Sequence, residues 1–293
     1  MLATEILKRE PQEGRLVTSF SCAAIVYDFD GTLSPGSMQE HSFLPDLGYS
    51  EVSKFWDEAG AEAKAQDADA ILTYMQLMLE KSAQPFTRDD LCRHGAQLPL
   101  FAGVSEWFSK VNAYASSIGL ELEHYVVSSG LREMIEASPI ASEFKHVFAS
   151  GFSYSPDGHA RWPAVAINYT GKTQFLFRIN KGILTTWDDH AVNRWMPLEH
   201  RPVPFSRMIF IGDGDTDIPS MKMVRLQGGT AIAVFSPEEW REPRTRTKIQ
   251  RLIAEDRVSY VAPADYTEGS QLDVTVRGVL GGIAEDVPRS ALP

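Results

Sequence analysis

The sequence predicts an α/β fold, doubly wound, in which a mostly parallel sheet carries helices on both faces and an all-helical segment is inserted near its start. Short apolar runs rich in β-branched residues alternate with amphipathic helical patterns along most of the 293 residues, and this alternation is typical of parallel sheets. Between residues 36 and 98 the pattern is helical throughout. Several apolar runs also end in small or acidic residues, as strands do beside a ligand site.

The composition is that of an ordinary soluble globular protein, with 43% hydrophobic and 23% charged residues. The net charge of −11 argues against a nucleic-acid binder, because clustered Lys and Arg are not evident. Cys22 and Cys92 have no metal-ligand spacing, so we expect two reduced structural thiols. Glutamates interrupt residues 1–20, and no window is apolar enough to cross a membrane, so we expect a cytoplasmic protein without a signal peptide.

The first strand is predicted at residues 25–27 and ends abruptly at Asp28, Phe29, Asp30 and Gly31. Two carboxylates separated by one residue point to the same side of an extended chain. At the carboxyl end of a parallel strand, that side faces the crevice in which α/β folds bind ligands. The alternative is structural: Asp28 only closes the strand, and Asp30 with Gly31 forms a tight turn.

The inserted segment reads as a series of helices. Residues 51–59 carry apolar side chains on one face, and apolar residues at 71, 72, 75, 78 and 79 follow the good helix formers of residues 61–70. Thr87 is predicted to cap a further helix, because acidic residues fill the turn after it. Pro99 then ends the helical block.

A helix over residues 103–118 leads to a strand over residues 122–127, which ends in Ser128, Ser129 and Gly130 before a helix through residue 137. Free N–H groups at a helix start attract anions, so this turn is a candidate phosphate site. The alternative is that Ser128 or Ser129 only caps the helix.

Two β segments, residues 144–154 and 162–170, are joined by a strong turn signal and are expected to form a hairpin beside the main sheet. A helix follows from Gly171 and Lys172 to Asn180. The Gly-Lys-Thr triplet at its start is not a nucleotide-binding P-loop, because Ala166 occupies the position that requires glycine.

A strand over residues 208–211 runs into a Gly-Asp-Gly-Asp-Thr-Asp sequence that ends at Asp217. A dinucleotide fingerprint would require glycine at position 217. A calcium loop would require glycine and glutamate where Ile218 and Val224 stand. What remains is a carboxylate cluster at a strand tip, suited to a hard cation such as Mg²⁺.

The rest of the chain continues the alternation. It contains a strand over residues 231–235, a helix over 237–254, a strand over 258–261 and a helix over 272–283. The polar loop over residues 263–270 follows a strand tip and is expected near the crevice.

Four of these features resemble the motifs of the haloacid dehalogenase-like (HAD) phosphohydrolases, in the family's order. The Asp-Phe-Asp-Gly-Thr-Leu sequence that begins at Asp28 resembles the first motif, and the Gly-Asp-Gly-x-x-Asp sequence at 212–217 resembles the fourth. Ser128 fits the second motif, and Lys172 fits the third, with Lys181 as the alternative. The likeness covers residues 25 to about 235 and favours the phosphoserine-phosphatase-like branch.

This resemblance implies a Rossmann-like core formed by residues 1–35 and 99–293, with residues 36–98 as a helical cap over the active site. It implies a Mg²⁺-dependent phosphatase of a small phosphorylated metabolite, working through an aspartyl-phosphate. A phosphomutase or other phosphotransferase, and a catalytically idle protein that binds a phosphorylated ligand, remain alternatives. The substrate's identity and the oligomeric state do not follow from the sequence.

The resemblance also assigns roles to residues. Asp28 would be the nucleophile and Asp30 the general acid and base; an alkoxide leaving group needs that proton donor, whereas a halide does not. The expected phosphate-binding residues are Ser128, Ser129, Gly130 and Lys172. The expected metal ligands are Asp28, Asp30 through its carbonyl, Asp213 and Asp217, whereas Asp215 falls at a variable position. Among the residues of the insertion, Phe43, Trp56, Tyr74 and Met75 are either specificity elements or core.

Overall fold

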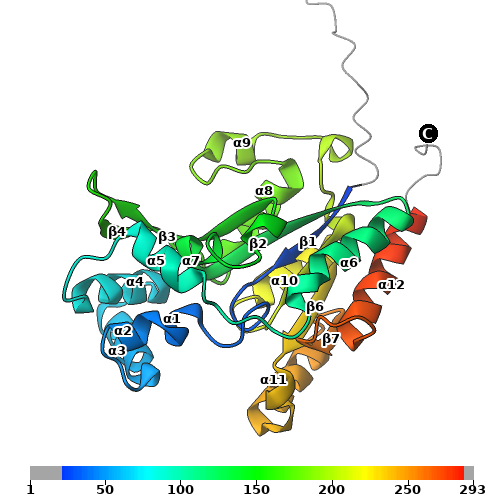
Figure 1. Ribbon diagram of the computed structural model, residues 1–293. Helices are drawn as coiled ribbons and strands as arrows, with labels where there is room; N and C mark the ends of the chain where they lie inside the picture. Colours follow the sequence, from blue (N-terminus) through cyan, green and yellow to red (C-terminus); the bar gives the residue numbers. More distant parts are fainter. Residues whose placement is uncertain (1–21, 287–293) are drawn as a thin grey trace, which may run out of the picture.

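The computed structural model describes residues 22–286, and in it a single seven-stranded sheet carries helices on both faces (Figure 1). The strand order is β4-β3-β2-β1-β5-β6-β7. All neighbouring strands are parallel except β3 and β4, which form an antiparallel hairpin at one edge. The predicted fold class is therefore confirmed. The strands are β1 Cys22–Tyr27, β2 Glu121–Leu131, β3 His146–Tyr154, β4 Ala160–Val165, β5 Met208–Gly212, β6 Thr230–Phe235 and β7 Tyr260–Pro263.

The central strand β1 is buried on both faces, as its continuous apolar sequence requires. Alternate residues of β1 belong to two hydrophobic cores, one on each face of the sheet. Ile25 and Tyr27 pack in the core that includes α6 and α12, and Val26 packs in the core that includes α8, α10 and α11. The bounds of these helices are α6 Val104–Ser117, α8 Gly171–Lys181, α10 Ile218–Leu226, α11 Pro243–Ala254 and α12 Gln271–Asp286. The site-bearing strands are therefore held from both sides.

The segment between β1 and α6, here called the helical insertion, contains only helices as named elements. The expected continuous run of helix through residues 61–79 breaks at Asp67, whose φ of 51° is left-handed, and Asp69 then caps a new helix by accepting from the N–H groups of Ile71 and Leu72. That residues 36–98 form a separate domain stays a prediction. The helices are α1 Met38–His41, α2 Phe43–Asp46, α3 Val52–Gln66, α4 Ala70–Lys81 and α5 Arg88–Gly95.

Other boundaries differ from those predicted. Strand β2 continues through residues 128–130 to Leu131, so the helix expected after it is reduced to the single turn α7, Arg132–Ile135. Residues 237–254 divide into the short helix η4, Pro237–Arg241, and α11, because Pro243 begins a new helix. The segment between α8 and β5 contains the short helices α9 Asp189–Asn193, η2 Leu198–His200 and η3 Phe205–Arg207, and η1 Ala141–Glu143 precedes β3.

Strands β1, β2, β5 and β6 end at the same edge of the sheet because they run parallel. The helical insertion and α11 lie on the two sides of this edge (Figure 1). Within residues 22–286, none of the helices combines the length and apolar character that a bilayer crossing needs. Cys22 and Cys92 are both free thiols, as expected, and the expectation about residues 1–20 lies outside the described residues.

Candidate active site

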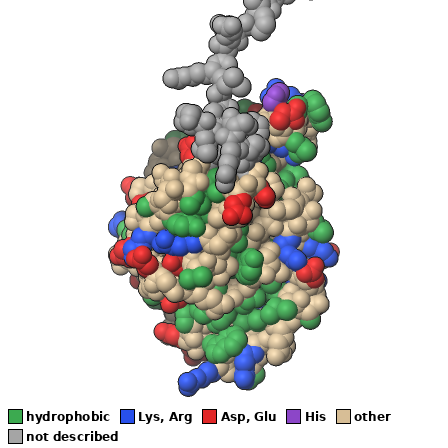
Figure 2. Space-filling model, turned by 90° about the vertical axis from the view of Figure 1, so that its right-hand side faces the viewer, with side chains coloured by type: hydrophobic (Ala, Val, Ile, Leu, Met, Phe, Trp, Pro, Cys, Tyr) green, Lys and Arg blue, Asp and Glu red, His purple; other side chains and the backbone are tan. Residues whose placement is uncertain are grey.

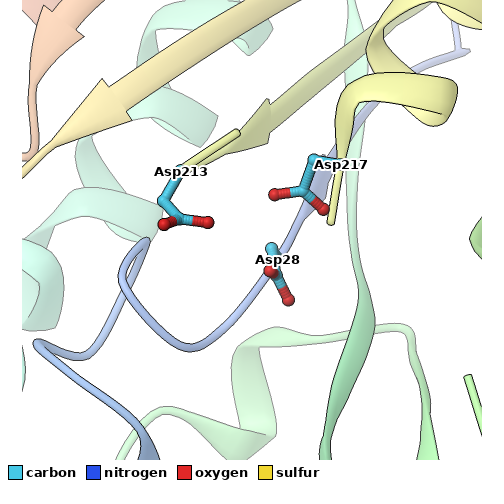
Figure 3. A group of neighbouring side chains, drawn as sticks. All are labelled: Asp28, Asp213 and Asp217. Carbon is cyan, nitrogen blue, oxygen red and sulfur yellow. The ribbon is translucent and has the colours of Figure 1, made fainter. Parts of the chain in front are cut away.

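Three carboxylates converge at the carboxyl ends of β1 and β5. One oxygen each of Asp28, Asp213 and Asp217 lies within 4.8 Å of the others, and Figure 3 shows the three side chains gathered at the ends of their elements. They come from the end of β1, the end of β5 and the start of α10. Asp28 and Asp217 are buried, whereas Asp213 is half-buried.

The register of the two strands explains this convergence. Tyr27 lies beside Ile211, and the N–H of Asp28 donates to the carbonyl of Ile211 at 2.9 Å, so both strands end at the same level. The Asp217 side chain then folds back over Gly212, where a Cβ atom would stand 2.3 Å from Asp217 Oδ2. Only glycine at that position allows this approach.

Lys172 links two of the carboxylates. Its Nζ lies 2.9 Å from Asp28 Oδ2 and 2.7 Å from Asp217 Oδ1, and the side chain is fully buried. Burial alone would lower the pKa of Lys172, but the carboxylates of Asp217 and Asp28 outweigh it and raise that pKa. Lys181, the alternative, lies at the other end of α8 and donates to the carbonyls of Val192 and Arg194, so Lys172 is the lysine at the acidic cluster.

Asp30 lies apart from the three converging carboxylates. Its Oδ1 accepts from the N–H of Met38 at 3.0 Å, at the start of the helical insertion. Its other oxygen lies against Gly130, where a Cβ atom would be 3.0 Å away. Burial and then the negative charge of Asp28 raise the pKa of Asp30 well above its ordinary value, because both disfavour the charged carboxylate.

Ser128, Ser129 and Gly130 lie beside Asp30 on the last part of β2, not at a helix start as expected. Ser128 Oγ is buried and accepts from the N–H of Gly130 at 3.0 Å. Neither serine caps α7, whose N-cap is Leu131 with no side-chain hydrogen bond. Ser129 Oγ is buried without a hydrogen-bond partner among the described residues, so a polar group remains available at this strand end.

The charges of the cluster fit a divalent cation. Three carboxylates face two ammonium groups, Lys172 and Lys248, and the latter lies 3.2 Å from Asp213. Burial raises the pKa of both Asp213 and Asp217, despite those lysines. Carboxylate oxygens are the ligands that Mg²⁺ prefers, and a cation here would supply the missing positive charge.

A cavity of about 1030 Å³ opens over these strand ends. Its lining includes Asp28, Asp30, Ser128, Ser129, Gly130 and Asp213. The helical insertion supplies one wall, with Trp56 and Tyr74, whereas Phe43 and Met75 are buried in the core. The loop over residues 263–270 lines no part of it; instead Tyr266 donates to the carbonyl of Thr32 at 2.9 Å, behind the first motif.

Sequence reasoning missed the opposite wall of the cavity, which α11 forms. Arg244, Lys248 and Arg251 line it at helical spacing. The available signal was the second part of the helix predicted over residues 237–254, because residues 243–254 contain four Lys or Arg and no acidic residue. Asp215, which was assigned no role, is exposed and forms ion pairs with Lys248 and Arg251.

Known proteins resemble this chain in sequence and in fold. A family model described as haloacid dehalogenase-like hydrolase matches residues 25–222. A protein of Borreliella burgdorferi described as uncharacterized is 25% identical over 279 residues, which is 85% of this chain and 93% of that protein.

Two solved structures share the fold. A HAD family hydrolase, t0658 from Salmonella enterica serovar Typhi, aligns with a TM-score of 0.55 and 13% identity over 87% of this chain and 69% of its own. A phospho-aspartyl intermediate analogue of phosphoserine phosphatase aligns with a TM-score of 0.51 and 14% identity over 88% of this chain and 99% of its own. At such identities the likeness concerns the fold alone.

Proposed function

The chain belongs to the haloacid dehalogenase-like hydrolases, and on that premise we propose that it is a phosphatase that hydrolyses a small phosphorylated metabolite with Mg²⁺ as its cofactor. One observation carries the proposal: a fully buried lysine, Lys172, contacts both Asp28 and Asp217, while an oxygen of Asp213 lies within 4.8 Å of oxygens of those two carboxylates. Negative carboxylates and a phosphate dianion repel one another, so a phosphoryl-transfer site needs such fixed positive charge.

In this proposal Asp28, Asp213 and Asp217 hold the metal ion. When bound, Mg²⁺ would supply positive charge to the phosphoryl oxygens and hold them in place. The carbonyl of Asp30 stays a predicted further ligand. Lys172 would fix the Asp28 carboxylate and neutralise part of the charge of the incoming phosphate.

The covalent step is assigned to Asp28. One of its carboxylate oxygens attacks phosphorus, the bond between phosphorus and the ester oxygen breaks, and an aspartyl-phosphate forms. Asp30 gives its proton to the leaving oxygen, which its raised pKa supports. The resulting Asp30 carboxylate then takes a proton from water, whose oxygen attacks phosphorus and releases phosphate and free Asp28.

Ser128 and the unpartnered hydroxyl of Ser129 would hydrogen-bond the phosphoryl oxygens. Glycine at position 130 lets Met38 and Asp30 lie against this end of β2, since a Cβ atom there would stand 2.2 Å from Met38 Cε. The helical insertion would act as a cap that limits water during the first step. Its contribution of Trp56 and Tyr74 to the cavity wall supports that role.

We expect Asp28→Asn to lower kcat for 4-nitrophenyl phosphate with Mg²⁺ by about 10³-fold or more, because an amide oxygen is a poor nucleophile. The fold should be kept, as judged by circular dichroism and the Tm. Asp215→Asn is the matched control, since Asp215 is an exposed carboxylate of the neighbouring motif.

Substantial activity in the Asp28→Asn protein would refute the nucleophile. A native protein that binds Mg²⁺ and phosphate but hydrolyses nothing across a broad panel would instead be an idle binding protein. Transfer of the phosphoryl group to another metabolite rather than to water would identify a mutase or phosphotransferase.

A further inference from the structure

The wall of the cavity formed by α11 is strongly basic. Four of its twelve residues are Lys or Arg and none is acidic, in a chain whose net charge is −11. Because α11 follows β6 and begins at the carboxyl edge of the sheet, its first turns stand next to the proposed phosphoryl site. Lys and Arg side chains occupy the lower tip of the face drawn in Figure 2, at the level where α11 begins in Figure 1.

Two of these cations already have partners. Lys248 lies 3.2 Å from Asp213 and 3.5 Å from Asp215, and Arg251 lies 3.2 Å from Asp215. Arg244 lines the same cavity, yet it forms no ion pair with any of residues 22–286, including Glu239 of η4, which also lines the cavity. No ion pair therefore commits the Arg244 guanidinium to the acidic cluster.

The opposite wall of the cavity, formed by α3 and α4, offers no ion-pair partner to Arg244. The residues of α3 and α4 that line the cavity carry no charge; they are Trp56, Ala59, Gly60, Ala70, Ile71 and Tyr74. An exposed guanidinium thus faces an uncharged wall across a cavity that opens onto the proposed nucleophile. A cation placed in this way is suited to an anionic group of a ligand that spans the cavity.

We infer that the substrate is a phosphomonoester with a second anionic group, a carboxylate or another phosphate, which Arg244 binds. The inference rests on the proposed phosphatase function. Arg244 lies four residues before Lys248 on α11, which corresponds to about 6 Å along the helix axis. Since Lys248 contacts Asp213, the second anion would lie roughly 6–10 Å from the scissile phosphate, the length of a small sugar.

Two pairs of probes test this inference, each differing in one anionic group. 6-Phosphogluconate is compared with glucose 6-phosphate for a carboxylate, and fructose 1,6-bisphosphate with fructose 6-phosphate for a phosphate. In the native enzyme we expect kcat/KM for the doubly anionic member of at least one pair to exceed that of its mate by about tenfold. The pair that shows the preference identifies the second anion.

In Arg244→Gln that ratio should fall toward one, through a higher KM and not a lower kcat, because the lost contact binds ground state and transition state alike. Arg244→Lys should restore part of it. Arg246→Gln is the matched control, since Arg246 is an exposed residue of α11 that does not line the cavity. Using a ratio within each enzyme removes effects on folding or active concentration.

Absence of any preference in the native enzyme would overturn the inference, and so would a ratio that Arg244→Gln leaves unchanged. Isothermal titration calorimetry of the same probes with the Asp28→Asn protein, with and without Arg244→Gln, measures the preference for the second anion in the absence of turnover. If no probe and no aryl phosphate is hydrolysed, the proposed function fails. A binding preference that Arg244→Gln removes would still support the second-anion site, whereas equal binding would refute it.

Discussion

Immediately before the proposed nucleophile, Tyr27 begins a buried chain of hydrogen bonds on the other face of β1. Trp107 Nε1 donates to the Tyr27 oxygen at 2.8 Å, so the Tyr27 hydroxyl itself donates to His124 Nδ1 at 3.0 Å. His124 Nε2 is then the donor to Asn112 Oδ1 at 2.8 Å. This chain requires a neutral imidazole, and burial lowers the pKa of His124 to about 3.

His124 should make the protein less stable in acid. Its pKa is about 6.5 in the unfolded chain and about 3 in the folded one, so below pH 6.5 the unfolded chain binds the proton and the folded chain does not. The free energy of unfolding should fall as the pH falls, by about 2 kcal/mol from this group between pH 7.5 and 5.0. Urea unfolding at both pH values measures it.

The control is His124→Asn, whose side-chain oxygen can still accept from Tyr27 but does not titrate. The loss of stability between the two pH values should be smaller in this variant by about 2 kcal/mol. An equal loss in both proteins would show that His124 titrates normally in the folded state.

At the residue scale the sequence predicted which carboxylates converge, but not the side-chain contacts around them. Asp28, Asp213 and Asp217 were found because each carboxylate follows a strand or begins a helix at a strand tip. Lys172 and Lys181 could not be separated, because residue type and helix membership say nothing about which end of a helix faces a cluster.

Contacts between distant side chains that belong to no motif could not be predicted from the sequence. Tyr27 and His124 lie 97 positions apart, and nothing in the sequence signals that their side chains meet. Lys248 was missed for the same reason, since its contact with Asp213 depends on how α11 packs beside β5.

Among the elements, the helical insertion is tied to the core at several points. Tyr74 donates to the carbonyl of Ser129 at 3.0 Å, and the N–H of Ala160 on β4 donates to the carbonyl of Phe86 at 2.9 Å. An isolated antiparallel bridge joins Thr87 to His159 in the same place. The Phe86 and Thr87 contacts attach the insertion to the hairpin at the sheet edge, directly before α5.

Helix α5 begins with a complete capping box, as the sequence predicted for Thr87. Thr87 Oγ1 accepts from the N–H of Asp90 at 3.2 Å, and Asp90 Oδ2 accepts from the N–H of Thr87 at 2.7 Å. We expect Thr87→Ala to lower the free energy of unfolding by about 1 kcal/mol, measured by urea denaturation. Thr87→Ser keeps the hydroxyl and should lose less; equal losses would mean that the cap contributes nothing.

Element types were predictable because the hydrophobic periods of helices and buried strands differ, and each predicted strand is present. The boundaries of the elements were harder to predict. Strand β2 extends to Leu131 because its pairing with β3, a long-range contact, resumes there after an irregularity that follows Ser128. The break at Asp67 depends on a left-handed backbone conformation that Asp tolerates but does not signal.

For the molecule as a whole, the sheet order decides the site. The first and fourth motifs lie about 185 residues apart, yet β1 and β5 are neighbours, so their acidic ends meet. The strand order reverses between β1 and β5, and such a reversal is where parallel α/β sheets bind ligands. Only the folded chain brings the three carboxylates together there. An unfolded chain holds them too far apart to share one cation.

Mg²⁺ should therefore stabilise the folded protein, because it binds the folded chain and not the unfolded one. At a concentration about 100 times its dissociation constant, the gain would be about 2.7 kcal/mol, which raises the Tm by several degrees in a protein of this size. Thermal unfolding with Mg²⁺ and with a chelator measures it. Asp213→Asn and Asp217→Asn should each remove most of the shift, whereas Asp215→Asn, which alters an exposed carboxylate of the same loop, should keep it. A shift that survives in Asp213→Asn, or that is absent from the native protein at millimolar Mg²⁺, would contradict a cation shared by these strand ends.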